Sequence, residues 1–453
     1  MPGKATAKII SYNSNMVDIC ASAARISTTQ GNAINIFDEA KNKSNNMELI
    51  EKVLKSGHKS VLEHAIFSIA FNEVSVFVEQ YIIECRLASF TVKSRRYVDY
   101  SNQGYYIPPS LNEEDKTIYC SYMKYLFDGY SQLIELGVPK EDARFLLPYS
   151  FCSNFYCTIN ARELVLLISS IVGGRGQVFP ELVDLANQLI LQINDLFPAM
   201  LSSLPNTYNR ATAYTTINNN KSCSNAELRF LHPEELGKIQ VLQAPLNPLS
   251  VLEFAHSISN SEPSEKFDIS TILSSIRPRE LEQIFYTFSI SSLSLACLTH
   301  LVRHRMQSII IPPFTHVQSN SFVLPNSISE NAEAWRMYKN VTERAVELRH
   351  EHQNIECLAA YEYYYMLSGN VLNVMTTMNA RELQHFMMLR SCNRAQWEIR
   401  AISLNMLAAL RDHFPLLFSH YGPSCVMQGR CPEGKLSCGK INQVKDAFAH
   451  MEW

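Results

Sequence analysis

The chain has 453 residues, and 46% of them are hydrophobic, which is enough to build more than one core; at about 150 residues per domain, length alone suggests roughly three domains. The 40 Lys and Arg against 43 Asp and Glu give a formal net charge of −3, which argues against a general nucleic-acid binder. No apolar run reaches the roughly 18 residues needed to span a membrane, and the N-terminal residues lack the apolar core of a signal peptide. The 12 cysteines are scattered, so a reduced, cytoplasmic protein is expected.

The predicted elements occur twice along the chain. In the first half, the β-branched run at 64–71 predicts a strand, an apolar helix ends at Arg86, and 162–200 has helical periodicity. In the second half, a strand is predicted at 285–290, an apolar helix ends near Arg305, and 379–412 is helical. This pattern predicts a mixed α+β fold.

A single offset relates the two halves. The sequence numbers of Arg86 and Arg305 differ by 305 − 86 = 219. The same offset relates three further anchors, namely Leu62-Glu63 with Leu281-Glu282, Ser89 with Ser308, and Asn160 with Asn379. We therefore predict two copies of one domain, at residues 1–217 and 238–453, joined by a linker at 218–237 that contains the polar run NNNKSCSN.

Each copy keeps polar residues that the other lacks. The first copy carries Ser94, Arg96 and Arg144, whereas the second has Pro313, Thr315 and Tyr363 at the equivalent positions of the repeat. The second copy carries Arg303 and Arg390, whereas the first has Glu84 and Ile171 there. Arginine forks bind phosphates through paired charge-assisted hydrogen bonds, so the two complementary sets predict one anion site shared between copies.

Three stretches carry a resemblance to a known family. They are HKSVLEH at 58–64, the Arg-His-Arg-x-x-Ser motif at Arg303 to Ser308 with its polar end at Ser94 to Tyr97, and NARELQHFMMLRSCNRAQWEIR at 379–400. Together they resemble the flavin-dependent thymidylate synthases, once per copy and over nearly the whole chain. The resemblance implies two tandem copies of that fold, each a small mixed sheet with long helices.

The resemblance also implies an activity and an assembly. Family members are homotetramers that bind FAD and dUMP where subunits meet, so a homodimer of this double-domain chain would replace the tetramer, with two working sites. The implied reaction is reductive methylation of dUMP to dTMP, with NADPH reducing FAD and methylenetetrahydrofolate giving the one-carbon unit. Its partners would be nucleotide and folate substrates, with no nucleic acid and no membrane.

Residue roles follow from the same resemblance. Arg303 and Arg390 are expected to be catalytic. The dUMP-binding residues would be Ser94, Arg96, Arg144, Arg303 and Arg390, and the FAD-binding residues His58, Ser60, Arg303, His304, Arg305, Asn379, Arg381 and His385. On the helix that follows Asn379, helical geometry places Arg381 and His385 on the side opposite to Asn379 and Arg390.

The sequence departs from the family pattern near the expected flavin and pyrimidine. The motif's Asn is Thr91 in the first copy and Ile310 in the second, and the Glu that commonly follows it is Val92 or Ile311. The Gln that commonly lies three residues before the motif's first Arg is His300 in the second copy. The base is therefore open: the alternatives are methyl or hydroxymethyl transfer to another pyrimidine nucleotide, and a flavin- or nucleotide-binding paralogue without turnover.

The C-terminal tail at 420–440 is rich in cysteine. Cys425, Cys431 and Cys438, with His420, form a Cys₃His set among Gly and Pro turns, which suggests a structural zinc site. The spacings are wider than those of ordinary zinc motifs, so loop thiols without metal are the alternative.

Overall fold

The computed structural model describes residues 4–204, 227–259 and 267–450, and these form two compact units. Unit 1 comprises 1–226 with 333–367, and unit 2 comprises 227–332 with 368–453. The segment 333–367, which the sequence assigns to the second copy, thus belongs to unit 1. Of the predicted linker, 218–226 lies outside the described residues, whereas 227–237 is part of unit 2.

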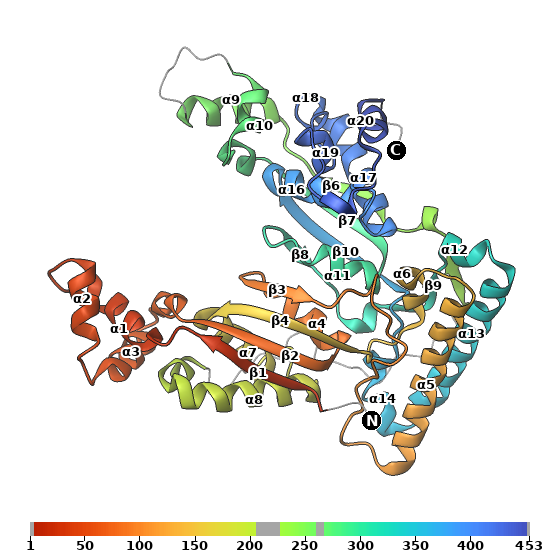
Figure 1. The fold of residues 1–453 in the computed structure, drawn as a ribbon, viewed down its shortest axis with the longest axis horizontal. Coiled ribbons are helices and arrows are strands. Elements are labelled where there is room, and N and C mark those ends of the chain that lie inside the picture. Colours follow the sequence, from red (N-terminus) through yellow and green to blue (C-terminus); the bar gives the residue numbers. More distant parts are fainter. Residues whose placement is uncertain (1–3, 205–226, 260–266, 451–453) are drawn as a thin grey trace. The chain divides into compact units, whose positions relative to one another are not determined.

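Unit 1 contains a four-stranded sheet. Its strands β1 (Thr6–Tyr12), β2 (Ile66–Ser75), β3 (Ala88–Val92) and β4 (Cys152–Asn160) lie in the order β1-β2-β4-β3, and every neighbouring pair is antiparallel. The helices and 3-10 turns that accompany this sheet are α1 (Met16–Ile26), α2 (Ala33–Ala40), α3 (Asn46–Lys55), η1 (Lys59–His64), α4 (Val76–Ile83), α7 (Ala161–Val172), α8 (Pro180–Leu196) and η3 (Pro198–Ser203). Helices α7 and α8 pack along the sheet, with α8 beside β1 (Figure 1). The expected mixed sheet is therefore wholly antiparallel in this unit.

A helical segment completes unit 1. The long helices α5 (Glu113–Glu135) and α13 (Ala332–Gln353) run side by side, with the short elements α6 (Lys140–Ala143), η2 (Arg144–Leu146), α14 (Glu356–Ala359) and α15 (Glu362–Tyr365) around them (Figure 1). The first residues of the two long helices differ by 332 − 113 = 219, so the helices are counterparts in the repeat. Gly129 permits their close approach, because a Cβ there would lie 3.1 Å from both methyl groups of Val341. One unit thus holds this helix from both copies.

Unit 2 contains a sheet of six strands. The order is β5-β9-β10-β7-β6, with β8 also paired to β10, and β5–β9 is the one parallel pair recorded among them. The strands are β5 (Arg229–Leu231), β6 (Lys238–Gln243), β7 (Phe285–Ser294), β8 (Ser308–Ile310), β9 (Gln318–Val323) and β10 (Asn370–Asn379). The helices are α9 (Pro248–Ser259), α10 (Ile269–Ser274), α11 (Leu295–Leu301), α12 (Asn326–Ser329), α16 (Ala380–Arg390), α17 (Trp397–His413), α18 (Pro415–Phe418), α19 (Ser424–Met427) and α20 (Ile441–His450), with 3-10 turns η4 (Pro233–Glu235), η5 (Arg279–Gln283), η6 (Phe314–His316) and η7 (Gly434–Leu436).

The two units repeat the same internal contacts at the predicted offset. Ser68 bonds Thr158 at 3.0 Å in unit 1, and Thr287 bonds Thr377 at 2.9 Å in unit 2. Further repeated contacts are the ion pairs Glu63–Arg162 and Glu282–Arg381, the helix caps Asn160 on Glu163 and Asn379 on Glu382, and the strand partners Ile66–Asn160 and Phe285–Asn379. The duplication read from a few anchors thus extends to hydrogen-bond partners and strand register.

The repeat preserves even an unfavourable backbone conformation. Glu73 has φ 52° and Ser292 has φ 54°, in the left-handed region that L-residues avoid. In both units the amide of this residue donates to an asparagine Oδ1 at 3.0 Å, from Glu73 to Asn154 and from Ser292 to Asn373. The asparagine bond helps to hold the same irregularity in β2 and in β7.

Most predicted elements are confirmed. The strand predicted at 64–71 is β2 and that at 285–290 is β7, while the two apolar helices are α4 and α11. The predicted helical stretches are each divided in two, as α7 with α8 and α16 with α17. Among the described residues, no helix is both long enough and apolar enough to cross a membrane.

Candidate functional site

The predicted cations of the first copy lie together in unit 1. Arg96 Nε donates to Glu141 Oε2 at 2.7 Å, and Arg144 Nε donates to the Glu141 carbonyl at 3.0 Å. The Ser94 hydroxyl accepts a hydrogen bond from the Arg96 amide at 3.3 Å. Arg144 is buried, whereas Arg96 is partly exposed. Because a guanidinium has five N–H donors, an arginine that is held by Glu141 can also bind an anion.

In unit 2, the Arg-His-Arg motif follows α11 and presents its three side chains differently. His304 is buried, whereas Arg303 and Arg305 are exposed on either side of it. Arg390, at the end of α16, donates from Nε to His304 Nε2 at 2.9 Å. His304 Nδ1 lies 3.1 Å from Glu382 Oε1, in the first turn of α16. The motif is thereby attached to the helix that carries the other predicted residues.

His304 is held as a neutral imidazole. Burial, then the Arg390 guanidinium and His385, hold its pKa well below the usual 6.5. Because Nε2 accepts from Arg390, the ring proton sits on Nδ1 and donates to Glu382. Burial also raises the pKa of the Glu382 carboxyl. This chain of hydrogen bonds fixes the orientation of the Arg390 side chain.

A large cavity opens along the other side of α16. Its volume is about 1110 Å³, and Asn379, Arg381 and His385 line it. The prediction that Arg381 and His385 face away from Arg390 agrees with this lining, which does not include Arg390. Asn379 was expected on the Arg390 side, but it lines the cavity because its side chain turns to cap α16 at the Glu382 amide, 2.8 Å away.

The equivalent part of unit 1 is nearly closed. A cavity of about 120 Å³ is lined by Arg162, the counterpart of Arg381, and by Lys59 and Leu62. The predicted cofactor residues His58 and Ser60 flank this region, and both side chains are exposed. A dinucleotide therefore has room in unit 2 but not in the corresponding hollow of unit 1.

Unit 1 also neutralises its counterpart of the Arg-His-Arg motif. Glu84, at the position of Arg303, is ion-paired with Arg175, and that guanidinium lies 4.5 Å from the Tyr81 ring centroid. Burial raises the pKa of Glu84, although Arg175 opposes the shift. The first copy therefore presents an internally paired acid where the second presents an exposed arginine.

Several site residues were missed by sequence reasoning. Glu141 links Arg96 to Arg144, and Glu382 holds His304; the recurrence of Glu after Asn-Ala-Arg in both copies was the only signal for Glu382. Arg277 and Lys445 add positive charge to the cavity of unit 2. Lys445 lies on α20 in the C-terminal tail, where no recognised motif drew attention to it.

The zinc prediction for the tail is not supported. Across residues 4–204, 227–259 and 267–450, no group of three or more His, Cys, Asp or Glu is arranged to hold a metal ion. Burial, together with the nearby thiols of Cys392, Cys431 and Cys438, raises the pKa of the Cys425 thiol. His420 instead lines the cavity beside α16.

Comparisons with known proteins place these features in a family. The sequence model of the family described as thymidylate synthase complementing protein (Thy1) matches residues 8–199 and 241–416, so it covers the core of both units. A flavin-dependent thymidylate synthase of Geobacter sulfurreducens is 31% identical over 230 residues, which is 47% of this chain and 99% of that protein. One of Pyrococcus furiosus is 35% identical over 167 residues, 34% of this chain and 68% of that protein.

Solved structures also match this chain, and one of them is an enzyme bound to a nucleotide analogue. The UMP/dUMP methylase PolB from Streptomyces cacaoi, bound with 5-Br dUMP, is 22% identical, with a TM-score of 0.37, and the match covers 44% of this chain and 94% of that chain. The assignment to a family depends on the sequence matches. Each bacterial or archaeal relative corresponds to less than half of this chain, as a duplicated domain requires.

Proposed function

We propose a function from the premise that the chain belongs to the thymidylate synthase complementing protein (Thy1) family. The matched relatives are flavin-dependent thymidylate synthases. The proposed activity of this chain is the conversion of dUMP to dTMP by FAD-dependent reductive methylation. Methylenetetrahydrofolate would supply the one-carbon unit and NADPH the reducing equivalents. Each site would combine the cations of a first copy with those of a second.

The complementary losses of the two copies carry this proposal. Ser94, Arg96 and Arg144 cluster within unit 1, whereas His304 and Arg390 are bonded to each other in unit 2. Neither unit repeats the other's set, although their other internal contacts recur at the same offset. A site shared between copies needs each set only once, so the duplicate could be lost without loss of function.

The residues of unit 1 suit the nucleotide phosphate. Arg144 is buried and Arg96 is fixed by Glu141, so two guanidinium groups are held with little freedom left to lose on binding. Charge-assisted hydrogen bonds from such groups are about twice as strong as neutral ones. Ser94 would add a hydroxyl hydrogen bond, and Arg390 and Arg303 would act on the pyrimidine side.

The residues of unit 2 suit FAD. The cavity of about 1110 Å³ is large enough for a dinucleotide, and Arg277, Arg381 and Lys445 supply positive charge for a pyrophosphate. FAD, when bound, supplies the hydride that completes the methyl group. Arg390 and Arg303 do not line this cavity, so the cation that would stabilise the negative charge of a reduced flavin within it is Arg381, together with Arg277 and Lys445.

We further propose a homodimer of this double-domain chain in place of the family homotetramer, with residues 1–217 and 238–453 as the two domains of the sequence. Unit 1 supports this view, because it holds α5 and its repeat counterpart α13 side by side. The packing of these two helices of one chain would replace the packing of matching helices from two subunits.

A second candidate differs only in the base. Thr91 in β3 and Ile310 in β8 occupy equivalent positions, paired with Tyr156 and Met375, and neither copy has the motif's amide side chain there. A site without that amide has lost a hydrogen bond by which a pyrimidine could be selected. Methylation or hydroxymethylation of another pyrimidine nucleotide is therefore the alternative.

The test is complementation of a thymidine-requiring bacterial strain, followed by product analysis. The purified chain is incubated with FAD, NADPH, methylenetetrahydrofolate and either dUMP, UMP or dCMP. Growth and dTMP formation support the proposal, and products from another nucleotide support the second candidate. A folded, flavin-loaded protein that modifies none of them would contradict both.

Variants of the two halves test the shared site. Arg96→Ala in the first copy and Arg390→Ala in the second should each lower kcat/KM by at least about 100-fold, the usual cost of an electrostatic group at a reacting centre. Thr315→Ala, at the position equivalent to Arg96 in the second copy, is the matched control and should keep full activity. An Arg96→Ala enzyme as active as the control would refute a shared site.

A further inference from the structure

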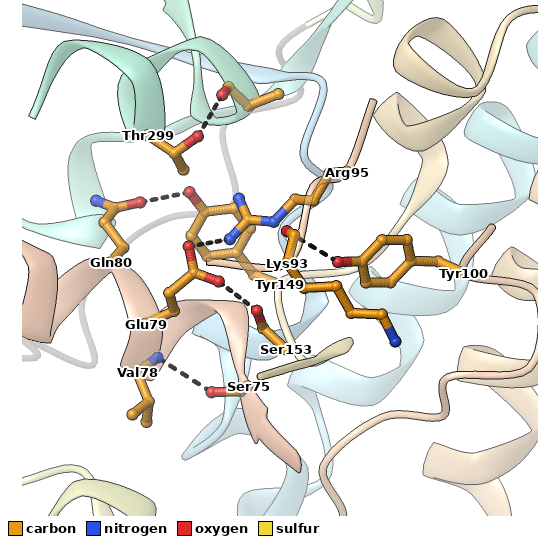
Figure 2. Close-up of polar contacts among 11 residues, drawn as sticks. Ser75, Val78, Glu79, Gln80, Lys93, Arg95, Tyr100, Tyr149, Ser153 and Thr299 are labelled. Atoms are coloured by element: carbon orange, nitrogen blue, oxygen red, sulfur yellow. Dashed lines mark hydrogen bonds and ion pairs between the residues drawn. The ribbon is translucent and has the colours of Figure 1, made fainter. Parts of the chain in front are cut away.

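A buried ion pair in unit 1 lies beside the proposed phosphate-binding residues. Glu79 on α4 is fully buried and Arg95 is 7% exposed, and the two are ion-paired. Glu79 also accepts a hydrogen bond from the Ser153 hydroxyl of β4, and the Arg95 guanidinium lies 5.4 Å from the Phe151 ring centroid. Figure 2 shows Arg95 directed into this cluster, with Glu79 between it and Ser153.

Arg95 stands between the two residues proposed to bind phosphate. Ser94 precedes it and Arg96 follows it, in the segment 93–98 that leaves β3. Other bonds also hold this segment: the Tyr100 hydroxyl donates to the Lys93 carbonyl at 3.3 Å (Figure 2), the Lys93 ammonium donates to Gln103 at 2.6 Å, and Arg96 is ion-paired with Glu141. The segment forms a turn in which the Val98 amide donates to the Ser94 carbonyl at 3.2 Å, and within this turn Arg95 is buried while Ser94 and Arg96 are partly exposed.

The other copy lacks this cluster altogether. At the equivalent positions of the repeat, Glu79 corresponds to Leu298 and Arg95 to Phe314, while Ser153 corresponds to Leu372. Leu298 and Leu372 are buried, so unit 2 fills the same place with apolar side chains. The copy without the ion pair is also the copy with Pro313 and Thr315 in place of Ser94 and Arg96.

Stability alone does not explain why unit 1 keeps the pair. Removing two charges from water costs several kcal/mol per ion, and apolar residues of similar size often serve as well or better. Unit 2 shows that this fold accepts the apolar version. Burial by itself would lower the pKa of Arg95, yet Glu79 and Tyr100 raise it above the usual value, so the guanidinium keeps its charge.

We propose that the Glu79–Arg95 pair is a positioning device, which fixes the 93–98 segment so that Ser94 and Arg96 present their polar groups to the phosphate of a nucleotide. The inference rests on the proposed function for the identity of that ligand. Glu79 and Arg95 are positioning residues, because they act through Arg96 and do not touch the substrate. Glu79 also balances the Arg95 charge, so that the attraction for the phosphate comes from Arg96 and Arg144.

The experiment replaces the cluster with an apolar one. Glu79→Leu, Arg95→Met and Ser153→Ala are combined in the full-length chain, so no buried charge or hydroxyl is left without a partner. We expect a melting temperature close to that of the parent, while the KM for dUMP rises about 10- to 100-fold and kcat changes little. When the same three changes are added to Arg96→Ala, they should have almost no further effect on KM. The reason is that the three changes and Arg96→Ala disturb the same contact, that of Arg96 with the phosphate.

A second readout does not depend on activity. Amide hydrogen exchange of residues 93–98 should become at least about 10-fold faster in the apolar variant, because the segment has lost its inward anchor. Unchanged exchange, or a KM effect that adds fully to that of Arg96→Ala, overturns the inference. If the parent chain binds no dUMP in calorimetry, the proposed function fails, and hydrogen exchange still decides whether the pair orders the segment.

The single change Arg95→Lys supplies the same readouts should the apolar variant fail to fold. Lysine keeps the charge but lacks the planar fork that reaches Glu79 and lies over Phe151. A smaller rise in the KM for dUMP and faster exchange of residues 93–98 are expected. An effect on kcat alone, with no change in KM or exchange, would contradict the positioning role.

Discussion

Arg381 and Arg162 offer the sharpest test of which copy binds the flavin. Each is the third residue of an Asn-Ala-Arg-Glu stretch, and each is ion-paired with a glutamate at the same offset, Glu282 and Glu63. The Arg381 and Arg162 side chains are 35% and 42% exposed, so either pair is worth only about 0.2–1 kcal/mol of stability after solvent screening. Replacing either arginine with alanine should therefore lower the melting temperature slightly and equally.

The two variants should differ in flavin binding. Arg381 lines the cavity of about 1110 Å³, whereas Arg162 lines one of about 120 Å³. A hydrogen bond from a charged group contributes about 1.5–3 kcal/mol, so Arg381→Ala should raise the Kd for FAD about 10- to 150-fold. Arg162→Ala should leave it unchanged. Quenching of flavin fluorescence on titration measures both, and equal weakening by the two variants would refute the assignment of the cofactor to unit 2.

Three further predictions follow from unit 2 and its counterparts. Burial holds the pKa of His304 below the usual 6.5, so as the pH falls this histidine is protonated in the unfolded chain before it is protonated in the folded one. Below about pH 6.5 this difference should lower the free energy of unfolding by about 1.4 kcal/mol per pH unit. His304→Gln should reduce that pH dependence, as measured by denaturant titrations. Gly237→Ala should cost about 2–4 kcal/mol, because φ is +56° and the new Cβ would lie 2.3 Å from Ile402, whereas Gly57→Ala, with nothing within 4 Å, should cost only about 1 kcal/mol in the same assay. Lys445→Gln should weaken FAD binding about 3- to 10-fold with a smaller salt dependence, and an unchanged salt dependence would place Lys445 outside the cofactor site.

The position of α13 shows where sequence reasoning stopped. The repeat assigns this helix to the second copy, and its start agrees, because it is related to the start of α5 by the offset of the repeat. The helix nevertheless packs against α5 within unit 1, where Val341 faces Gly129. Periodicity identifies a helix and its apolar face, but it does not say which of two similar domains supplies the opposite face.

The tail illustrates the same limit for chemistry. Three cysteines and a histidine among turns satisfy the composition of a zinc site, but the structure directs His420 to the cavity beside α16. Ligand geometry depends on how α19 and α20 pack, and spacing along the chain does not determine that packing. Lys445 and Arg277 were missed for the same reason, because they join the cavity only through tertiary folding.

The sequence by itself determined the duplication, the mixed α+β class, the strands β2 and β7 and the complementary distribution of arginines, because these depend on residue type and on spacing along the chain. Only the tertiary structure decided that Glu141 joins Arg96 to Arg144, that burial and Arg390 lower the pKa of His304 while Glu382 bonds its ring, and that Arg95 turns inward to Glu79. Those contacts join residues as far as 86 positions apart, and the burial that shifts their pKa values exists only once the chain has packed.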